Sequence, residues 1–125
     1  MNIKFPKNEA AIANSQKVLE VIVNFLNAAH LRGFNGEDLK PSSPARLVAS
    51  GIGVTYELLD RKCSVSLEID TLFTGECMLI RFLVTANAGH LDMQQATEFH
   101  DVYGKLIKLA LTARDVGESW KQGGE

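Results

Sequence analysis

The sequence predicts an α+β fold in the order N-terminal helix, three-stranded antiparallel meander, C-terminal helix (α-β-β-β-α). Two observations predict it. Apolar residues recur at helical spacing in an early and a late segment, and three segments between them alternate apolar and polar residues with the period of a strand. The length of 125 residues fits a single globular domain, 1–125, for which we expect flexible ends at 1–7 and 116–125.

The first helix is predicted to begin after Asn8, whose side chain suits the N-cap position, and to end near Gly33. His30 and Arg32 would then lie at the helix C-terminus, where positive charge is favourable. The following segment, from Phe34 to Pro44, is rich in glycine, proline and serine, so we expect a linker loop there.

Three strands follow the linker. Residues 52–58, 63–70 and 77–86 each place apolar side chains at every second position. A polar turn at residues 60–62 separates the first two, and Leu72 and Phe73 lie in the turn before the third, where their apolar side chains are unexpected. The second helix is predicted to start at Asp92, with Gln95 completing a variant of the capping box, and to give way to a polar tail after Asp115. The predicted core combines the apolar positions of all elements: Val18, Ile22, Phe25, Val65, Leu67, Ile80, Phe82, Phe99, Tyr103 and Leu106.

Composition and charge exclude several classes of protein. Apolar residues make up 46% of the chain and charged residues 22%, which is typical of a globular protein and not of a disordered chain. The net charge of -2 provides no general attraction for nucleic acid or anionic membranes. The N-terminal segment lacks the apolar core of a signal peptide, so we expect a cytoplasmic protein in which Cys63 and Cys77 are reduced thiols.

Two groups of side chains could bind a metal. The first contains His90, Asp92, Glu98 and His100, but a helix cap explains Asp92, and the spacing of the two histidines is unlike that of zinc ligands.

The second group contains Glu57, Glu68 and Asp70, which could share one face of neighbouring strands and hold Mg²⁺. Alternating acidic residues are also ordinary on a solvated sheet face. We therefore expect no metal, no cofactor and no catalytic residue, and an enzymatic role is not favoured.

The main departure from a simple soluble domain is apolar surface where polar residues are expected. Leu79 and Leu83 flank Arg81 on the predicted outer face of the third strand, and Gly104, Ile107 and Leu111 form a second stripe on the second helix. Either the linker loop, the C-terminal tail or the other helix packs there within one chain, or the surface contacts a protein.

The order of predicted elements resembles the first part of the small, acidic, dimeric chaperones that serve bacterial secretion systems. The apolar surface leads to the first hypothesis, a non-enzymatic, homodimeric protein-binding module of chaperone, inhibitor or adaptor type. It would use either the face of Leu79, Arg81 and Leu83 or the stripe of Gly104, Ile107 and Leu111. Its partners would be a second copy and another protein, with no nucleic acid and no membrane. The alternative is a small-molecule-binding protein or small enzyme with a pocket near His90, Arg81 and His100.

Overall fold

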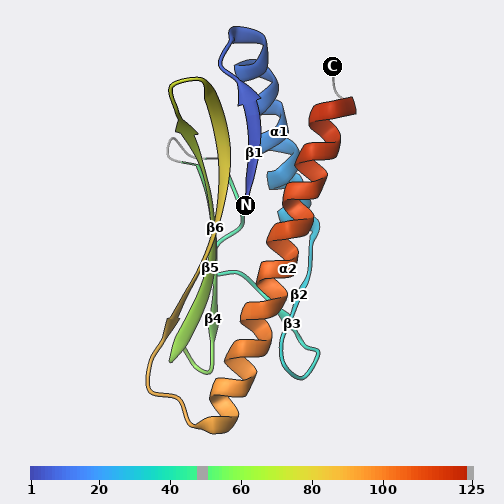
Figure 1. The fold of residues 1–125 in the computed structure, drawn as a ribbon. Helices are drawn as coiled ribbons and strands as arrows, with labels where there is room; N and C mark the ends of the chain where they lie inside the picture. Colours follow the sequence, from blue (N-terminus) through green and yellow to red (C-terminus); the bar gives the residue numbers. More distant parts are fainter. Residues whose placement is uncertain (48–50, 124–125) are drawn as a thin grey trace.

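The computed structural model describes residues 1–47 and 51–123. One antiparallel sheet has the strand order β1-β6-β5-β4, and the two long helices lie on the same face of it (Figure 1). The elements, in chain order, are β1 (Asn2–Pro6), α1 (Glu9–Ala28), β2 (Leu31–Arg32), β3 (Asp38–Leu39), β4 (Ile52–Leu58), β5 (Cys63–Phe73), β6 (Cys77–Ala88) and α2 (Met93–Gly123). The α+β class is confirmed, but the sheet has a fourth strand beside the predicted meander.

The fourth strand is β1, which lies in the segment that we expected to be a flexible end. Its side chains alternate, with Ile3 and Phe5 buried and their neighbours exposed, so this short segment buries one face as a strand does. It pairs antiparallel with the first half of β6, from Asn2 opposite Arg81 to Pro6 opposite Cys77. That pairing makes β1 one edge of the sheet.

Helix α1 begins as predicted, because the Asn8 side chain accepts a hydrogen bond from Ala11 N at 2.8 Å. The predicted end at Gly33 is wrong, since the helix stops at Ala28 and Ala29 is extended. His30 and Arg32 therefore lie beyond the helix, and Arg32 forms an ion pair with Asp38 across the β2–β3 hairpin at 2.9 Å.

The predicted linker loop is partly wrong as well, because it contains β3. The turn of the β2–β3 hairpin includes Gly36, whose positive φ of 82° suits glycine. The rest of the linker runs alongside β4, and Ser42 N donates a hydrogen bond to Thr55 O of β4 at 2.7 Å. Asn27 fixes the same loop, because its amide group donates to Ala45 O and accepts from Ala45 N at 2.8 and 2.9 Å. These contacts cover the outer edge of β4.

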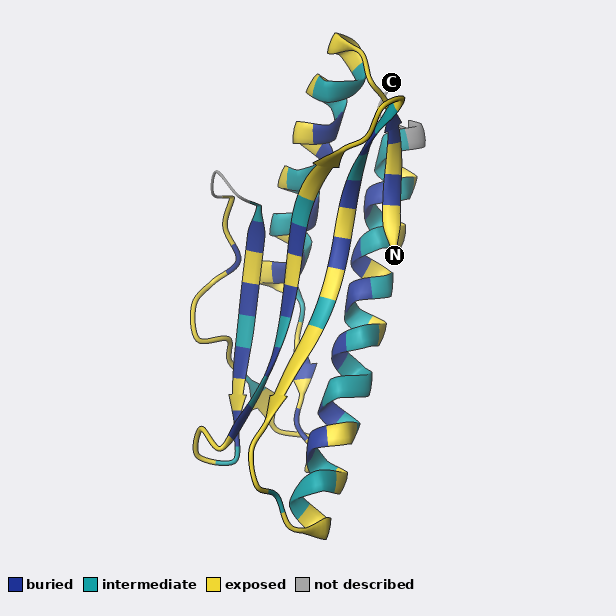
Figure 2. Cartoon of the chain, turned by 60° about the vertical axis from the view of Figure 1, so that its left-hand side comes forward, coloured by how far each residue is buried: buried dark blue, intermediate teal, exposed yellow. Residues whose placement is uncertain are grey.

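The predicted meander is present as β4, β5 and β6. Strands β5 and β6 are longer than expected, so Leu72 and Phe73 lie in a strand and not in a turn. The turn between β4 and β5 holds three consecutive residues with positive φ, Leu59, Asp60 and Arg61. Residues on one face of each strand are buried against the helices, except at the ends of β5 and β6, and those on the other face are partly or fully exposed (Figure 2).

Helix α2 starts with the predicted reciprocal cap. Asp92 Oδ1 accepts from Gln95 N at 2.8 Å, and Gln95 Oε1 accepts from Asp92 N at 3.2 Å. The helix then continues to Gly123, through most of the segment that we expected to be a flexible tail. Gly117 is buried and Trp120 packs partly against the core, so tertiary contacts support this last part of the helix.

The core lies between the sheet and the helices. Of the predicted core residues, Phe25 and Tyr103 are only partly buried and pack against its margin. The other predicted core residues are buried: Val18, Ile22, Val65, Leu67, Ile80, Phe82, Phe99 and Leu106. Ile3, Phe5 and Met78 are buried core residues that the prediction did not include.

Candidate protein-interaction site

The outer face of the sheet carries an exposed apolar cluster around one ion pair. Leu83 is 47% exposed and Leu72 is 40% exposed, while Leu79 is partly buried. Between them Arg81 donates to Asp70 through two nitrogens, at 3.0 and 2.7 Å. The hydrogen bonds and charge of Asp70 raise the pKa of Arg81 above its ordinary value. The charge of Arg81 is thus locally compensated. The apolar cluster is confined to the three leucines, because exposed Glu68 lies opposite Leu83 and exposed Lys4 lies opposite Leu79.

The predicted apolar stripe of α2, formed by Gly104, Ile107 and Leu111, lies on the side of the helix that runs alongside the β1–β6 edge of the sheet. Lys121 marks this side, because its ammonium group donates to Lys4 O in β1. Tyr103 precedes Lys121 by five helical turns of about 3.6 residues, so the two side chains lie on the same side of α2. Ile107 follows Tyr103 by about one turn and therefore lies close to that side as well. The opposite side is marked by Lys105, which donates to Gly33 O in the β2–β3 hairpin at 3.0 Å.

The residues of this stripe are only partly covered. Gly104, Ile107 and Leu111 each have intermediate exposure. A Cβ atom added at Gly104 would have no neighbouring atom within 4 Å. Gly104 therefore faces open space, and another backbone could approach closely there.

The second half of β6 is a feature that the sequence analysis missed. Strand β1 pairs with β6 only as far as Arg81, and one further hydrogen bond joins Phe82 N to Met1 O. From Leu83 to Ala88, no strand described by the structure pairs with the outer side of β6. Figure 2 shows the short strand at the N label beside only one end of its long neighbour. We call the segment Leu83–Ala88 the open edge.

Neither the linker nor the described part of the tail covers these surfaces. The linker lies along β4, at the far side of the sheet from β6. The tail is helical to Gly123 and continues α2 along β1 and α1. Packing of the linker or the tail over the apolar surface is therefore not realised in residues 1–47 and 51–123. Helix α1 does pack against α2, but it leaves Gly104, Ile107 and Leu111 partly exposed. The outer face around Leu83 and the α2 side around Ile107 lie on either side of the open edge.

The structure does not bring together the residues of the alternative pocket. Arg81 lies on the outer face of the sheet and is engaged with Asp70, whereas His100 lies on α2, which packs on the other face. His90 is exposed in the loop between β6 and α2. Among the described cavities, none is lined by any of these three residues.

The candidate metal ligands are also dispersed. Glu57 lies opposite Ser64 and pairs with Arg61 at 3.1 Å, so it is not opposite Glu68 or Asp70 as the Mg²⁺ hypothesis required. Within the described ranges there is no group of three or more His, Cys, Asp or Glu side chains that could hold a metal ion. The absence of a metal from the native protein stays a prediction.

The two cysteines occupy different environments. Cys63 is buried at the start of β5, and burial raises the pKa of its thiol above the ordinary value. Cys77 is partly exposed, and its sulfur lies 3.1 Å from the hydroxyl of Thr74. A raised pKa reduces the thiolate fraction of Cys63, which disfavours a nucleophilic role.

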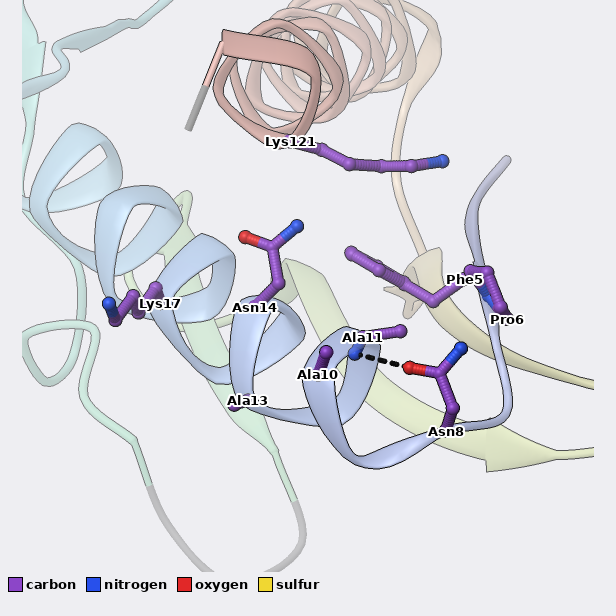
Figure 3. A pocket seen from close by; sticks show the side chains of 9 residues that line it. All are labelled: Phe5, Pro6, Asn8, Ala10, Ala11, Ala13, Asn14, Lys17 and Lys121. Atoms are coloured by element: carbon purple, nitrogen blue, oxygen red, sulfur yellow. Dashed lines mark hydrogen bonds between the residues drawn. The ribbon is translucent and has the colours of Figure 1, made fainter. Parts of the chain in front are cut away.

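The largest described cavity is a half-open groove of about 490 Å³ between β1, α1 and the end of α2. Phe5 and alanines of α1 form its apolar surface, and Asn14, Lys17 and Lys121 supply polar groups. Figure 3 shows Lys121 extending from α2 towards Phe5, with Lys17 at the other end of the groove. The Lys121 ammonium lies 5.1 Å from the centre of the Phe5 ring.

Comparison with known proteins gives no match to any family model, curated protein or solved structure. No helix in the described ranges combines the length and apolar character needed to cross a membrane. Function therefore has to be argued from the surface itself.

Proposed function

We propose that the protein is a non-enzymatic protein-binding module that acts as a homodimer. The observation that carries this proposal is apolar surface on both sides of the open edge, around Leu83 and around Ile107, in a fold whose linker and helical tail pack elsewhere. Exposed apolar surface next to an unpaired strand is typical of a protein interface. A chaperone, an inhibitor and an adaptor are all compatible with this surface.

Two further observations support a binding role over catalysis. Asp92 and Gln95 cap α2, and Asp70 pairs with Arg81, so these polar groups of the candidate chemical sites have structural partners. The second surface on α2 includes Gly104, which reduces helix stability by about 1 kcal/mol relative to alanine but permits close helix approach. A glycine at a partly exposed helix position is consistent with a packed partner.

Sedimentation equilibrium at micromolar concentration tests the proposal. The unmodified chain should be a dimer, and Leu83→Glu or Ile107→Glu should weaken it because each places a charge in a desolvated contact. Thr112→Glu is the matched control, since Thr112 is exposed on another side of α2. A monomer at every concentration, or equal effects of all three substitutions, would contradict the proposal.

A second candidate function is the binding of a small amphipathic anion in the groove lined by Phe5, Lys17 and Lys121. The volume is within the range of about 300–1,000 Å³ that is usual for ligand sites, and apolar surface lies between two ammonium groups. Calorimetric titration with octanoate, with octanol as the uncharged comparison, tests this candidate. Binding of octanoate that is lost in Lys121→Ala and kept in Lys108→Ala would support this candidate. Equal affinity for octanol would show that the lysines do not bind the carboxylate group and would contradict it.

A further inference from the structure

We infer that the open edge of β6 pairs antiparallel with the open edge of a second copy, which joins the two sheets into one continuous sheet. The inference rests on the proposed homodimer and specifies how it forms. It assigns to Leu83–Ala88 a role that neither the outer face nor the α2 stripe has by itself.

At the open edge, some backbone N–H and C=O groups of β6 lie in the plane of the sheet and point away from β5, where no neighbouring strand is present among the described residues. Backbone groups of an antiparallel strand alternate between its two neighbours. Because Phe82 N donates to Met1 O on the β1 side, the groups of Val84, Ala86 and Ala88 point to the same side. No hydrogen bond from these three N–H groups to another described residue is present. The alternate residues Thr85 and Asn87 face β5, with which β6 is paired along this length.

The two outer strands of this sheet, β4 and β1, each carry features that hinder the addition of another strand. The edge of β4 receives the hydrogen bond from Ser42, and the edge of β1 contains Pro6, which has no N–H group, and Lys4, whose carbonyl accepts from Lys121. The open edge has no proline, no charged side chain and no covering loop. On the β4 side of β5, Thr71–Phe73 also has no described partner strand, but that stretch is only three residues long. The open edge, with six residues, is the longer unpaired stretch of the described sheet and the better suited to accept another strand.

A second copy fits this edge better than an unrelated strand for reasons of symmetry and charge. Any strand can pair antiparallel with itself across a twofold axis, and such an interface uses the same residues from both copies. The segment Leu83–Ala88 carries no charge, so self-pairing brings no like charges together. Its side chains are also small near the centre, at Ala86.

The pairing of one short strand is too small to hold a dimer, because stable interfaces bury about 1,200–2,000 Å² in total. The side of α2 that follows the β1–β6 edge supplies the remainder. In an antiparallel pair about a twofold axis, α2 of each copy would lie on the same face of the joined sheet, with Tyr103 and Ile107 turned towards the partner helix. Gly104, which faces open space, then allows the helix backbones to approach. Both predicted surfaces contribute to one interface.

Amide hydrogen exchange, resolved by residue with NMR, tests this inference on the unmodified chain. At concentrations above the dissociation constant, the amides of Val84, Ala86 and Ala88 should exchange at least about tenfold more slowly than at concentrations where the chain is monomeric. Thr85 and Asn87 are internal controls, because their amides face β5 and should be protected at both concentrations.

A variant adds a second measurement. Ala86→Pro removes an N–H group that has no partner in the monomer, so sedimentation should show a folded monomer, whereas Ala86→Ser keeps the N–H group and should remain a dimer. If Ala86→Pro does not fold, the exchange pattern of the unmodified chain decides the question.

The outcomes separate the inference from the proposed function. A dimer in which the amides of Val84, Ala86 and Ala88 exchange as fast as in the monomer would overturn edge pairing and leave the homodimer in place. A monomer at every concentration would overturn both. Protection of these amides that appears only when a different protein is added would assign the edge to that partner and overturn the self-pairing.

Discussion

Gly117 should tolerate a side chain less well than Gly104, because α2 contacts both α1 and β1 there. A Cβ atom at this position would lie 2.6 Å from Ile3 Cδ1, 3.1 Å from Ile22 Cδ1 and 3.2 Å from Val18 Cγ1. All three side chains are fully buried, so none can move into free space. Alanine at Gly117 therefore forces the core itself to shift.

The expected size of the effect follows from two opposing contributions. Replacing a helical glycine by alanine stabilises the folded state by about 1 kcal/mol, whereas overpacking a core costs about 1–3 kcal/mol. Gly117→Ala should thus lie between neutral and a loss of about 2 kcal/mol. Gly104→Ala should instead gain about 1 kcal/mol, because its added Cβ meets no atom within 4 Å. Urea unfolding, below the concentration at which the chain associates, measures both free energies.

A double-mutant cycle identifies the atom responsible. Ile3→Val removes Cδ1, the atom nearest to the added Cβ, and alone should cost about 0.5–1.5 kcal/mol. In the double variant Gly117→Ala with Ile3→Val, the clash is relieved, so the combined loss should be smaller than the sum by at least about 0.5 kcal/mol. Additive losses, or equal gains from Gly117→Ala and Gly104→Ala, would refute the close approach of α2 to β1.

Two further predictions concern the linker and alkaline pH. Asn27→Ala should lower the free energy of unfolding by about 1–3 kcal/mol, because both hydrogen bonds to the Ala45 backbone are lost; an unchanged urea midpoint would contradict this. Burial raises the pKa of Cys63 and of Tyr56 above their ordinary values of 9.0 and 10.0, so the unfolded chain releases these protons first as pH rises. Their contribution to stability is therefore complete below those values and is lost above them, which urea unfolding at successive pH values measures; a stability that stays constant at higher pH would contradict it.

Local signals explain which parts of the fold were predictable. The caps at Asn8 and Asp92 use side chains within three residues of their targets, and the strands of the meander alternate clearly along the sequence. These elements were predicted close to their observed positions. The apolar outer face at Leu83 followed from the same alternation, because residue parity alone decides which face a strand residue occupies.

Elements that depend on distant partners were not predictable in this way. Strand β1 is short, and it is supported by pairing with β6, far along the chain. The end of α2 has a polar sequence, but Gly117 and Trp120 pack against the core and extend the helix. The open edge could not be predicted from the sequence for the same reason. It exists only because β1 is shorter than β6, and the difference appears once the strands are paired.

The length of β1 gives a last prediction, in which the open edge is closed without changing any residue of the chain. Strand β1 runs antiparallel to β6 and Met1 O bonds to Phe82 N, so residues added ahead of Met1 would continue along Leu83–Ala88. A six-residue extension that alternates Thr and Val, one residue for each position of the open edge, should pair there within the same chain.

The tethered strand has a high effective concentration, so it should compete successfully with a second copy and yield a monomer in sedimentation equilibrium. An extension of equal length made of Gly and Ser has little strand propensity and should leave the dimer intact. If both extended chains remain dimeric, the interface does not use the open edge. If the Thr and Val extension alone gives a monomer while Leu83→Glu has no effect, the backbone edge, and not the apolar outer face, holds the two copies together.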